Sequence, residues 1–194
     1  MLFGIMLLTP EGLLAGMAHM LFHGVIKMSL FLCAGAFMHV TGREYIYEIN
    51  GIGRRMPYTF TAYTLCALSL TGIPLFCGFV SKWQLLQATL RAAGAAAGNA
   101  VPDSRLSQIL PYILYAGTTA LVIAAFLCAM YTLSISVRAF FPMDDKDRFR
   151  EKKVKEAGPL MLVPIWIFAA VNLALGICPG PILAVLTAIG EGRM

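Results

Sequence analysis

The chain alternates long apolar runs with short polar connections. Charged side chains are absent from three stretches, residues 56–81, 106–137 and 157–190. A fourth stretch, 12–40, is equally apolar apart from three histidines and one lysine. Each stretch exceeds the roughly 20 residues that a helix needs to cross a bilayer. The pattern therefore predicts an all-α membrane bundle of about four transmembrane helices, with residues 1–194 forming one domain.

The same runs set the expected helix boundaries. We expect helices near residues 12–40, 57–95, 108–141 and 158–178, with a short apolar ending in PGPILAVLTAIG. The opening residues, MLFGIMLL, have no basic region before them and are typical of the tail of another membrane helix rather than of a signal peptide. This start predicts that the chain is a fragment of a longer protein.

The second expected helix contains helix-breaking residues in the segment LTGIPLFCGFVSKW. Pro74 has no amide hydrogen and its ring clashes with a carbonyl of the preceding turn, while Gly72 and Gly78 flank it. We therefore expect an interruption between about Thr71 and Phe79. At membrane depth, a broken helix persists where its free backbone groups are buried in protein or line a hydrated cavity.

Composition agrees with a membrane protein and excludes several functions. Hydrophobic residues make up 59% of the chain and charged residues 13%, whereas soluble domains carry about 25% charge. No phosphate-binding loop, dinucleotide fingerprint, zinc spacing or nucleophile motif is present, so we expect no catalytic residue, cofactor or metal. The five cysteines are isolated in apolar surroundings and are expected to be small buried side chains: Cys33, Cys66, Cys77, Cys128 and Cys178.

Basic residues gather in the first and third connections. The first carries three arginines, and the third carries six lysines and arginines between Lys146 and Lys155. The opposite side carries only Arg91, Arg105 and Arg193. The positive-inside rule places the basic loops in the cytoplasm and both ends of the chain outside a plasma membrane. The net charge of +5 reflects this asymmetry and indicates no nucleic-acid partner; the Lys146–Lys155 loop is a solvated connector or a contact for a cytoplasmic partner.

The first apolar stretch carries titratable residues in the motif HMLFHGVIK. His19, His23 and Lys27 are four residues apart, so they drift by only about 80° around a helix and rise about 6 Å per step. A lysine at mid-membrane costs at least about 2.5 kcal/mol and normally faces protein or a hydrated cavity. Three such groups on one stripe favour a proton relay. The alternative is that the histidines bond to neighbouring helices and the lysine reaches the interface.

Lys82 is a second ionisable residue at membrane depth. It follows Gly78 by four residues, close enough to the expected break to be stabilised there. The alternative is a simple proline kink, with Lys82 extending to the interface beside Trp83. The sequence leaves both interpretations open.

Three linked segments resemble a known family: AHMLFHGVIKMSLFLCAGAF, INGIGRRMP and LSLTGIPLFCGFVSKW. They are similar to the C-terminal part of the antiporter-like subunits shared by respiratory complex I, membrane-bound hydrogenases and Mrp-type cation/proton antiporters. The resemblance implies the last four helices of a longer subunit. It also implies that His19, His23 and Lys27 belong to a central hydrophilic axis and that Lys82 marks the proton exit to the outer face.

Three functions follow from these observations. The first is a proton-conducting membrane subunit of a redox complex such as NADH:quinone oxidoreductase, in which partner subunits perform the redox chemistry. The second is a subunit of an Mrp-type Na⁺/H⁺ antiporter, and the motifs do not separate the two. Both imply other membrane subunits and the lipid bilayer as partners. The third, a haem-binding membrane anchor, is disfavoured because His19 and His23 lie on one helix and no histidine follows His39.

Overall fold

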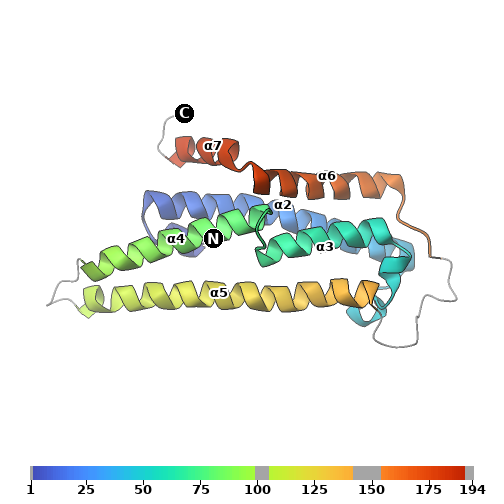
Figure 1. Cartoon of the computed structure of the whole chain (residues 1–194), viewed down its shortest axis with the longest axis horizontal. Coiled ribbons are helices and arrows are strands. Elements are labelled where there is room, and N and C mark those ends of the chain that lie inside the picture. The colour runs from blue at the N-terminus through green and yellow to red at the C-terminus, as the bar shows by residue number, and fades with distance from the viewer. Residues whose placement is uncertain (1, 99–104, 142–153, 191–194) are drawn as a thin grey trace.

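The computed structural model describes residues 2–98, 105–141 and 154–190, and the regular elements in these ranges are helices (Figure 1). The elements are α1 (Leu2–Met6), α2 (Pro10–Thr41), two short 3₁₀ turns (Ile46–Glu48 and Ile52–Arg54), α3 (Pro57–Thr71), α4 (Cys77–Gly98), α5 (Arg105–Phe140), α6 (Pro159–Ile177) and α7 (Gly180–Gly190). The predicted all-α membrane bundle is confirmed.

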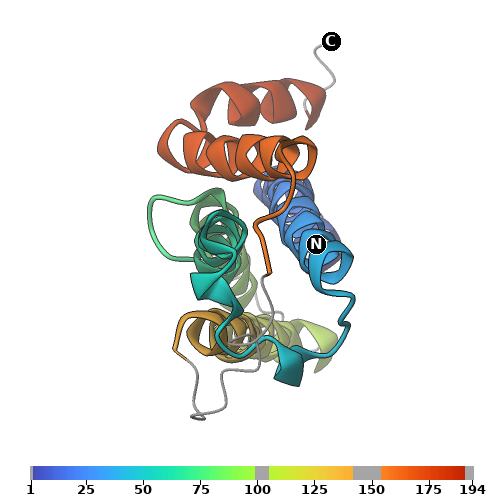
Figure 2. The ribbon, with the colours of Figure 1, turned by 90° about the vertical axis from the view of Figure 1, so that its right-hand side faces the viewer.

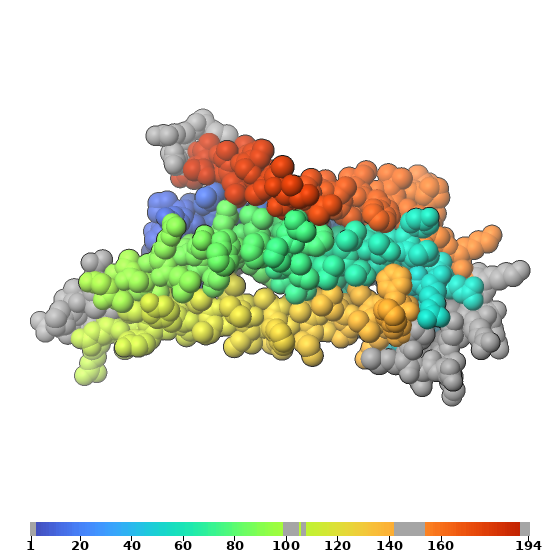
Figure 3. All heavy atoms as spheres, viewed as in Figure 1, coloured from blue at the N-terminus to red at the C-terminus, as the bar shows by residue number. Residues whose placement is uncertain are grey.

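The helices run along one long axis in three layers. Figures 1 and 2 show α3 and α4 between α5 on one side and the α6–α7 layer on the other, with α2 beside them. Contacts agree with this arrangement, because α4 and α3 pack on α5, while α2 contacts α3, α4 and α6. The space-filling view shows the same stacking over the length of the molecule (Figure 3).

Helix lengths match membrane crossing. α2 has 32 residues and α5 has 36, which at 1.5 Å per residue gives about 48 and 54 Å, more than the roughly 30 Å of bilayer hydrocarbon. Together with α6, these helices are long and apolar enough to span a membrane. The second expected helix is discontinuous, as predicted: α3 ends at Thr71 and α4 begins at Cys77, within the predicted interruption.

Local sequence explains where α2 starts and stops. The Thr9 hydroxyl accepts a hydrogen bond from the Gly12 amide at 3.1 Å, and Pro10 occupies the first helical position, where its missing amide hydrogen costs nothing. At the other end Gly42 adopts a left-handed conformation with φ of 66°. Between these two ends α2 is one uninterrupted helix. It carries His19, His23 and Lys27, which we call the histidine ladder.

Small residues are frequent among the buried positions between helices. Lipid is as apolar as a leucine side chain, so helices in a membrane associate through close packing and polar contacts. The buried alanines fit this rule, since they let backbones approach: Ala15, Ala18, Ala62, Ala67, Ala88 and Ala169. Large apolar side chains such as Leu160 and Phe126 are exposed on the outside of the bundle. The burial pattern is therefore that of a bilayer protein.

Two sequence expectations need correction or lie outside the described structure. Cys178 is exposed, because it follows the end of α6 in the connection to α7, so the prediction of a buried side chain is wrong there, and Cys128 is only half-buried. Most of the Lys146–Lys155 loop lies outside the described residues.

Just after this loop, Glu156 accepts hydrogen bonds from the Tyr58 amide at 3.0 Å and the Thr59 hydroxyl at 2.6 Å. This carboxylate therefore caps the positive N-terminal end of α3.

Candidate functional site

The break between α3 and α4 begins with a defined helix ending. Gly72 has φ of 98°, a left-handed conformation that side chains disfavour. Its amide donates to the Ser69 carbonyl at 3.0 Å, and the Ile73 amide donates to the Leu68 carbonyl at 3.2 Å. This pair of bonds is the Schellman ending of a helix. These bonds satisfy the carbonyls of Leu68 and Ser69. The carbonyls of Leu70 and Thr71, which come next, are left without a backbone partner.

Lys82 binds those two carbonyls. Its ammonium donates to the Leu70 carbonyl at 2.5 Å and to the Thr71 carbonyl at 3.0 Å. Both oxygens lie at the C-terminus of α3, the negative end of that helix dipole, which favours a cation. The Lys82 side chain reaches back toward the start of α4, as long helical side chains do. The interpretation of Lys82 as a residue of the helix break therefore agrees with its contacts, although its role in proton transfer stays a prediction.

The start of α4 lies directly against the end of α3. A Cβ atom on Gly78 would come within 1.9 Å of the Ser69 carbonyl oxygen, so only glycine fits at this position. The Gly78 amide also donates to the Ser69 hydroxyl at 3.3 Å. Pro74 lies in the connection between the two helices. The three residues predicted to make the break therefore have distinct positions. Gly72 ends α3, Pro74 lies in the connection, and Gly78 allows close contact between α3 and α4.

The histidine ladder approaches this break from α2. The rings of His19 and His23 stack with their centroids 5.5 Å apart. His19 Nδ1 lies 3.0 Å from the hydroxyl oxygen of Ser81, and that hydroxyl donates to the Gly78 carbonyl at 3.3 Å. Ser81 is buried and precedes Lys82 on α4. It thus links the ladder to the broken helix, and the sequence analysis did not single it out.

An open cavity of about 440 Å³ joins these groups. His19 and His23 of α2 line it together with Lys82 of α4, and its remaining walls are mainly small and apolar side chains of α5. Lys27 is half-buried one turn beyond His23 and does not line this cavity. His19, His23 and Lys82 therefore line one cavity, and Lys27 lies outside it.

The Lys82 ammonium and the two imidazoles of the cavity have no acidic partner among the described residues. No carboxylate lines the cavity, and the ion pair between Arg91 and Glu11, at 2.9 Å, involves exposed side chains. The described part of the chain also contains no group of three histidine, cysteine or acidic side chains placed to hold a metal ion. The titratable side chains that line the cavity are therefore two imidazoles, one ammonium and the Cys128 thiol.

A second polar group, on the far side of the break, was missed by the sequence analysis. Asn172 of α6 is fully buried and hydrogen-bonds to Ser69 and Cys77, which flank the break. Cys66 donates to the Ser29 hydroxyl at 3.1 Å beside them. The available signal was a lone carboxamide in the otherwise apolar stretch 157–190. Cys66 and Cys77 are buried as expected, but they are also hydrogen-bonding groups.

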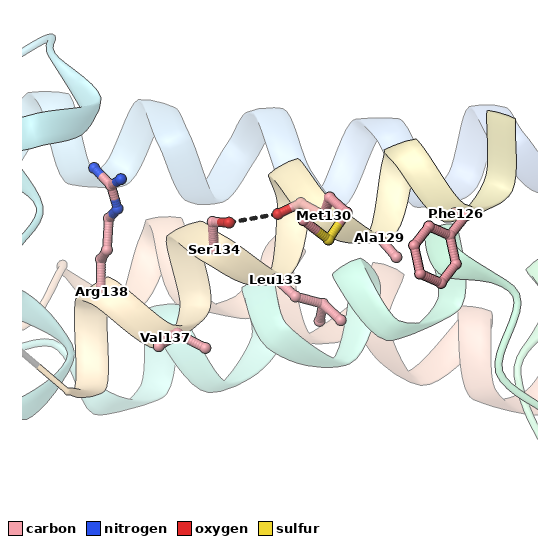
Figure 4. A pocket seen from close by; sticks show the side chains of 7 residues that line it. All are labelled: Phe126, Ala129, Met130, Leu133, Ser134, Val137 and Arg138. Carbon is pink, nitrogen blue, oxygen red and sulfur yellow. Dashed lines mark hydrogen bonds between the residues drawn. The ribbon is translucent and has the colours of Figure 1, made fainter. Parts of the chain in front are cut away.

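Another hollow, of about 420 Å³, lies along α5 alone. Figure 4 shows its lining side chains spread from Phe126 to Arg138, with the Ser134 hydroxyl turned back to the Met130 carbonyl. Arg138 is the one ionisable side chain in this lining. A guanidinium cannot exchange its proton in proteins, so this surface groove offers no proton relay.

The amino-acid sequence is similar to one protein family and to several curated antiporter subunits. The family model for the transmembrane region of NADH:quinone oxidoreductase and Mrp antiporters matches residues 1–107. The Na⁺/H⁺ antiporter subunit A1 of Staphylococcus haemolyticus is 30% identical over 169 residues, covering 87% of this chain and 20% of that protein. The same subunit of Staphylococcus aureus strain JH9 is 30% identical over 166 residues. The chain thus spans about a fifth of the length of these relatives.

Solved structures share the fold. The Mrp complex of Dietzia sp. DQ12-45-1b contains a chain that superposes with a TM-score of 0.74 at 23% identity, over 96% of this chain and 39% of that one. An archaeal respiratory membrane complex, the membrane-bound sulfane sulfur reductase, contains one with a TM-score of 0.66 at 26% identity, over 91% and 25%. The family match extends over the ladder and the break, and the chain belongs to the NADH:quinone oxidoreductase/Mrp antiporter transmembrane family.

Proposed function

We propose that this chain conducts protons within an antiporter-type membrane subunit, through His19, His23, Lys27 and Lys82. The observation that carries the proposal is the shared cavity. Imidazoles from α2 and an ammonium from α4 line one space beside a helix break. The alternative, in which Lys82 extends to the interface as an anchor, is disfavoured by its two bonds to the carbonyls that end α3.

The chemistry requires groups that exchange protons and water that connects them. An imidazole donates through one ring nitrogen and accepts through the other, and an ammonium can release a proton where it is partly desolvated. Because one water occupies about 30 Å³, a cavity of about 440 Å³ has room for on the order of ten waters. Protons can then pass between His19, His23 and Lys82 without direct contact between the side chains. Lys27 extends the path by one helical turn.

The identity of the relatives favours a Na⁺/H⁺ antiporter assembly. The curated relatives are named as antiporter subunits, and the sulfane sulfur reductase shows that related folds also occur in a respiratory complex. We therefore place the antiporter first and the redox complex second. In the redox alternative, partner subunits carry out electron transfer and this chain only moves protons.

The distribution of basic residues supports an orientation. Arg54, Arg55 and Lys155 are exposed at the end of the bundle where α3 and α6 begin, and Arg43 follows α2 at the same end (Figure 1). By the positive-inside rule this end faces the cytoplasm of a cell with the chain in its plasma membrane. The C-terminal end of α7 then lies near the outer side (Figure 1).

The test is proton flux through the whole assembly in proteoliposomes. A Na⁺ gradient is imposed and internal pH is followed for the wild type and for a variant with both His19→Ala and His23→Ala. His39→Ala is the matched control, because His39 is an exposed histidine on the same helix. We expect slow flux in the double variant and wild-type flux in the control; equal flux in all three contradicts the relay. Flux that needs an electron donor and acceptor instead of Na⁺ favours the redox complex.

A further inference from the structure

α6 brings one carboxamide into the centre of the bundle. Asn172 is fully buried and shares a face of the helix with Ile165 and Ala169, which are buried at four- and three-residue spacing. A buried amide costs free energy unless its hydrogen bonds are made. The groups that hydrogen-bond to Asn172 therefore identify the segments that this side chain holds together.

Those partners belong to both halves of the broken helix. The Ser69 hydroxyl of α3 donates to Asn172 Oδ1 at 2.7 Å, and the Cys77 thiol of α4 donates to the same oxygen at 3.0 Å. The amide nitrogen Nδ2 lies 3.7 Å from the sulfur of Cys66 on α3. One side chain of α6 thus bridges the last turn of α3 and the first turn of α4.

A second contact fixes α6 at the same place one turn later. A Cβ atom on Gly176 would lie 2.1 Å from the Leu75 carbonyl oxygen and 2.5 Å from the Phe76 Cα atom. The backbone of α6 therefore rests directly on the connection between α3 and α4. Asn172 and this contact together hold both helix ends and the segment between them.

The bridge lies next to the carbonyls that bind the ammonium. Ser69 immediately precedes Leu70, whose carbonyl accepts the 2.5 Å hydrogen bond from Lys82. α6 lies on the opposite side of α3 and α4 from α5, and Asn172 does not line the cavity (Figures 1 and 2). Asn172 can therefore influence proton transfer through the positions of the α3 end and the α4 start, and not by direct contact with the cavity.

We propose that Asn172 is a positioning residue: it fixes the carbonyls of Leu70 and Thr71 relative to α4, so that they hold the Lys82 ammonium in the cavity. This inference rests on the proposed proton relay. Without the bridge, the end of α3 can tilt away from α4, and the two acceptors move from the ammonium. The other titratable groups lining the cavity are His19 and His23 of α2 and Cys128 of α5, and the hydrogen-bond partners of Asn172 are Ser69, Cys77 and Cys66 instead.

The test compares two buried positions on α6. Asn172→Leu keeps the approximate size and removes the hydrogen bonds, whereas Ile165→Ala removes packing on the same face without touching the break. Proton flux is measured in proteoliposomes across a pH series, with the copurifying subunits quantified for each variant. For Asn172→Leu we expect flux lower by about tenfold to a hundredfold, the effect of a misplacement near 1 Å. We also expect the pH of half-maximal flux to move downward, because the ammonium has lost acceptors.

The control and the parallel variants separate the possible failures. Ile165→Ala should keep the wild-type pH profile even where its assembly yield falls. If Asn172→Leu shows the wild-type rate and profile while Lys82→Ala is inactive, the positioning role is wrong and the relay stands. If Lys82→Ala is also fully active, the proposed function itself fails.

A milder variant covers the case in which Asn172→Leu does not assemble. Ser69→Ala leaves Asn172 in place and removes one hydrogen bond of the bridge, together with the bond that the Gly78 amide makes to the same hydroxyl. It should shift the pH profile in the same direction and by a smaller amount. If neither variant assembles, or if Ser69→Ala assembles with an unchanged profile, the role of Asn172 is structural and the inference is overturned.

Discussion

Gly78→Ala changes one atom at the contact between the two half-helices. The added Cβ would lie 1.9 Å from the Ser69 carbonyl oxygen and 2.8 Å from its carbonyl carbon. The first distance is about 1.5 Å short of the 3.4 Å at which ordinary contact begins. Both obstructing atoms belong to the backbone, so no side chain can turn away to relieve the overlap. The start of α4 must therefore move away from α3.

The expected cost follows from what this movement disrupts. Overpacking of a close contact costs about 1–3 kcal/mol. The hydrogen bond from the Gly78 amide to the Ser69 hydroxyl, 3.3 Å long, adds about 1 kcal/mol when it is lost. The total destabilisation is about 2–4 kcal/mol. The displacement also separates Lys82 from the α3 carbonyls, so proton flux should fall in whatever assembly remains.

Gly94→Ala is the matched control on the same helix. A Cβ atom at Gly94 meets nothing within 4 Å, and alanine improves helix propensity by about 1 kcal/mol. The assay is the temperature at which half of the purified assembly dissociates, followed by proton flux in proteoliposomes. We expect a lower dissociation temperature and slower flux for Gly78→Ala only. Equal values for the two variants would refute the close packing of α3 on α4.

Two further substitutions test separate parts of the structure. Lys27→Ala should reduce proton translocation by more than it reduces assembly, because this half-buried lysine extends the path from His23; normal flux in vesicles containing the assembled variant contradicts that role. Glu156→Gln removes the charge at the N-terminal end of α3 and should cost about 1 kcal/mol, seen as a lower dissociation temperature with unchanged flux. A strong loss of flux without loss of stability would contradict the assignment of Glu156 as a structural cap.

The break was predictable because its causes are local. Pro74 cannot continue a helix and Gly72 favours a left-handed conformation, whatever surrounds them. The observed gap from Thr71 to Cys77 is shorter than the expected one, since the Schellman bonds carry α3 to its last residue and Gly78 already belongs to α4. Sequence also placed Lys82 near the break, but it could not identify the carbonyls that bind it, because their availability depends on which bonds the helix end makes.

The contribution of α6 was not predicted because its partners are distant in the chain. Asn172 bonds to residues 95 to 106 positions away, and a neutral amide in an apolar run gives no charge signal. The position of Lys27 outside the cavity has a geometric reason. The ladder drifts by about 80° over eight residues, so its last member faces a different direction from its first. A shared stripe therefore predicts neighbouring positions on a helix and does not ensure a shared cavity.

Proton flux through assemblies carrying Lys82→Arg separates a relay from an anchor. Arginine keeps the positive charge and can bond to carbonyls, but a guanidinium does not release its proton in proteins. Lys155→Arg, at an exposed position outside the expected spans, is the control. With equal amounts of assembled complex in proteoliposomes, a relay at Lys82 gives flux near background for Lys82→Arg and wild-type flux for the control. Full flux in the Lys82→Arg assembly would contradict proton transfer through Lys82 and leave it as a fixed cation that binds the carbonyls at the end of α3.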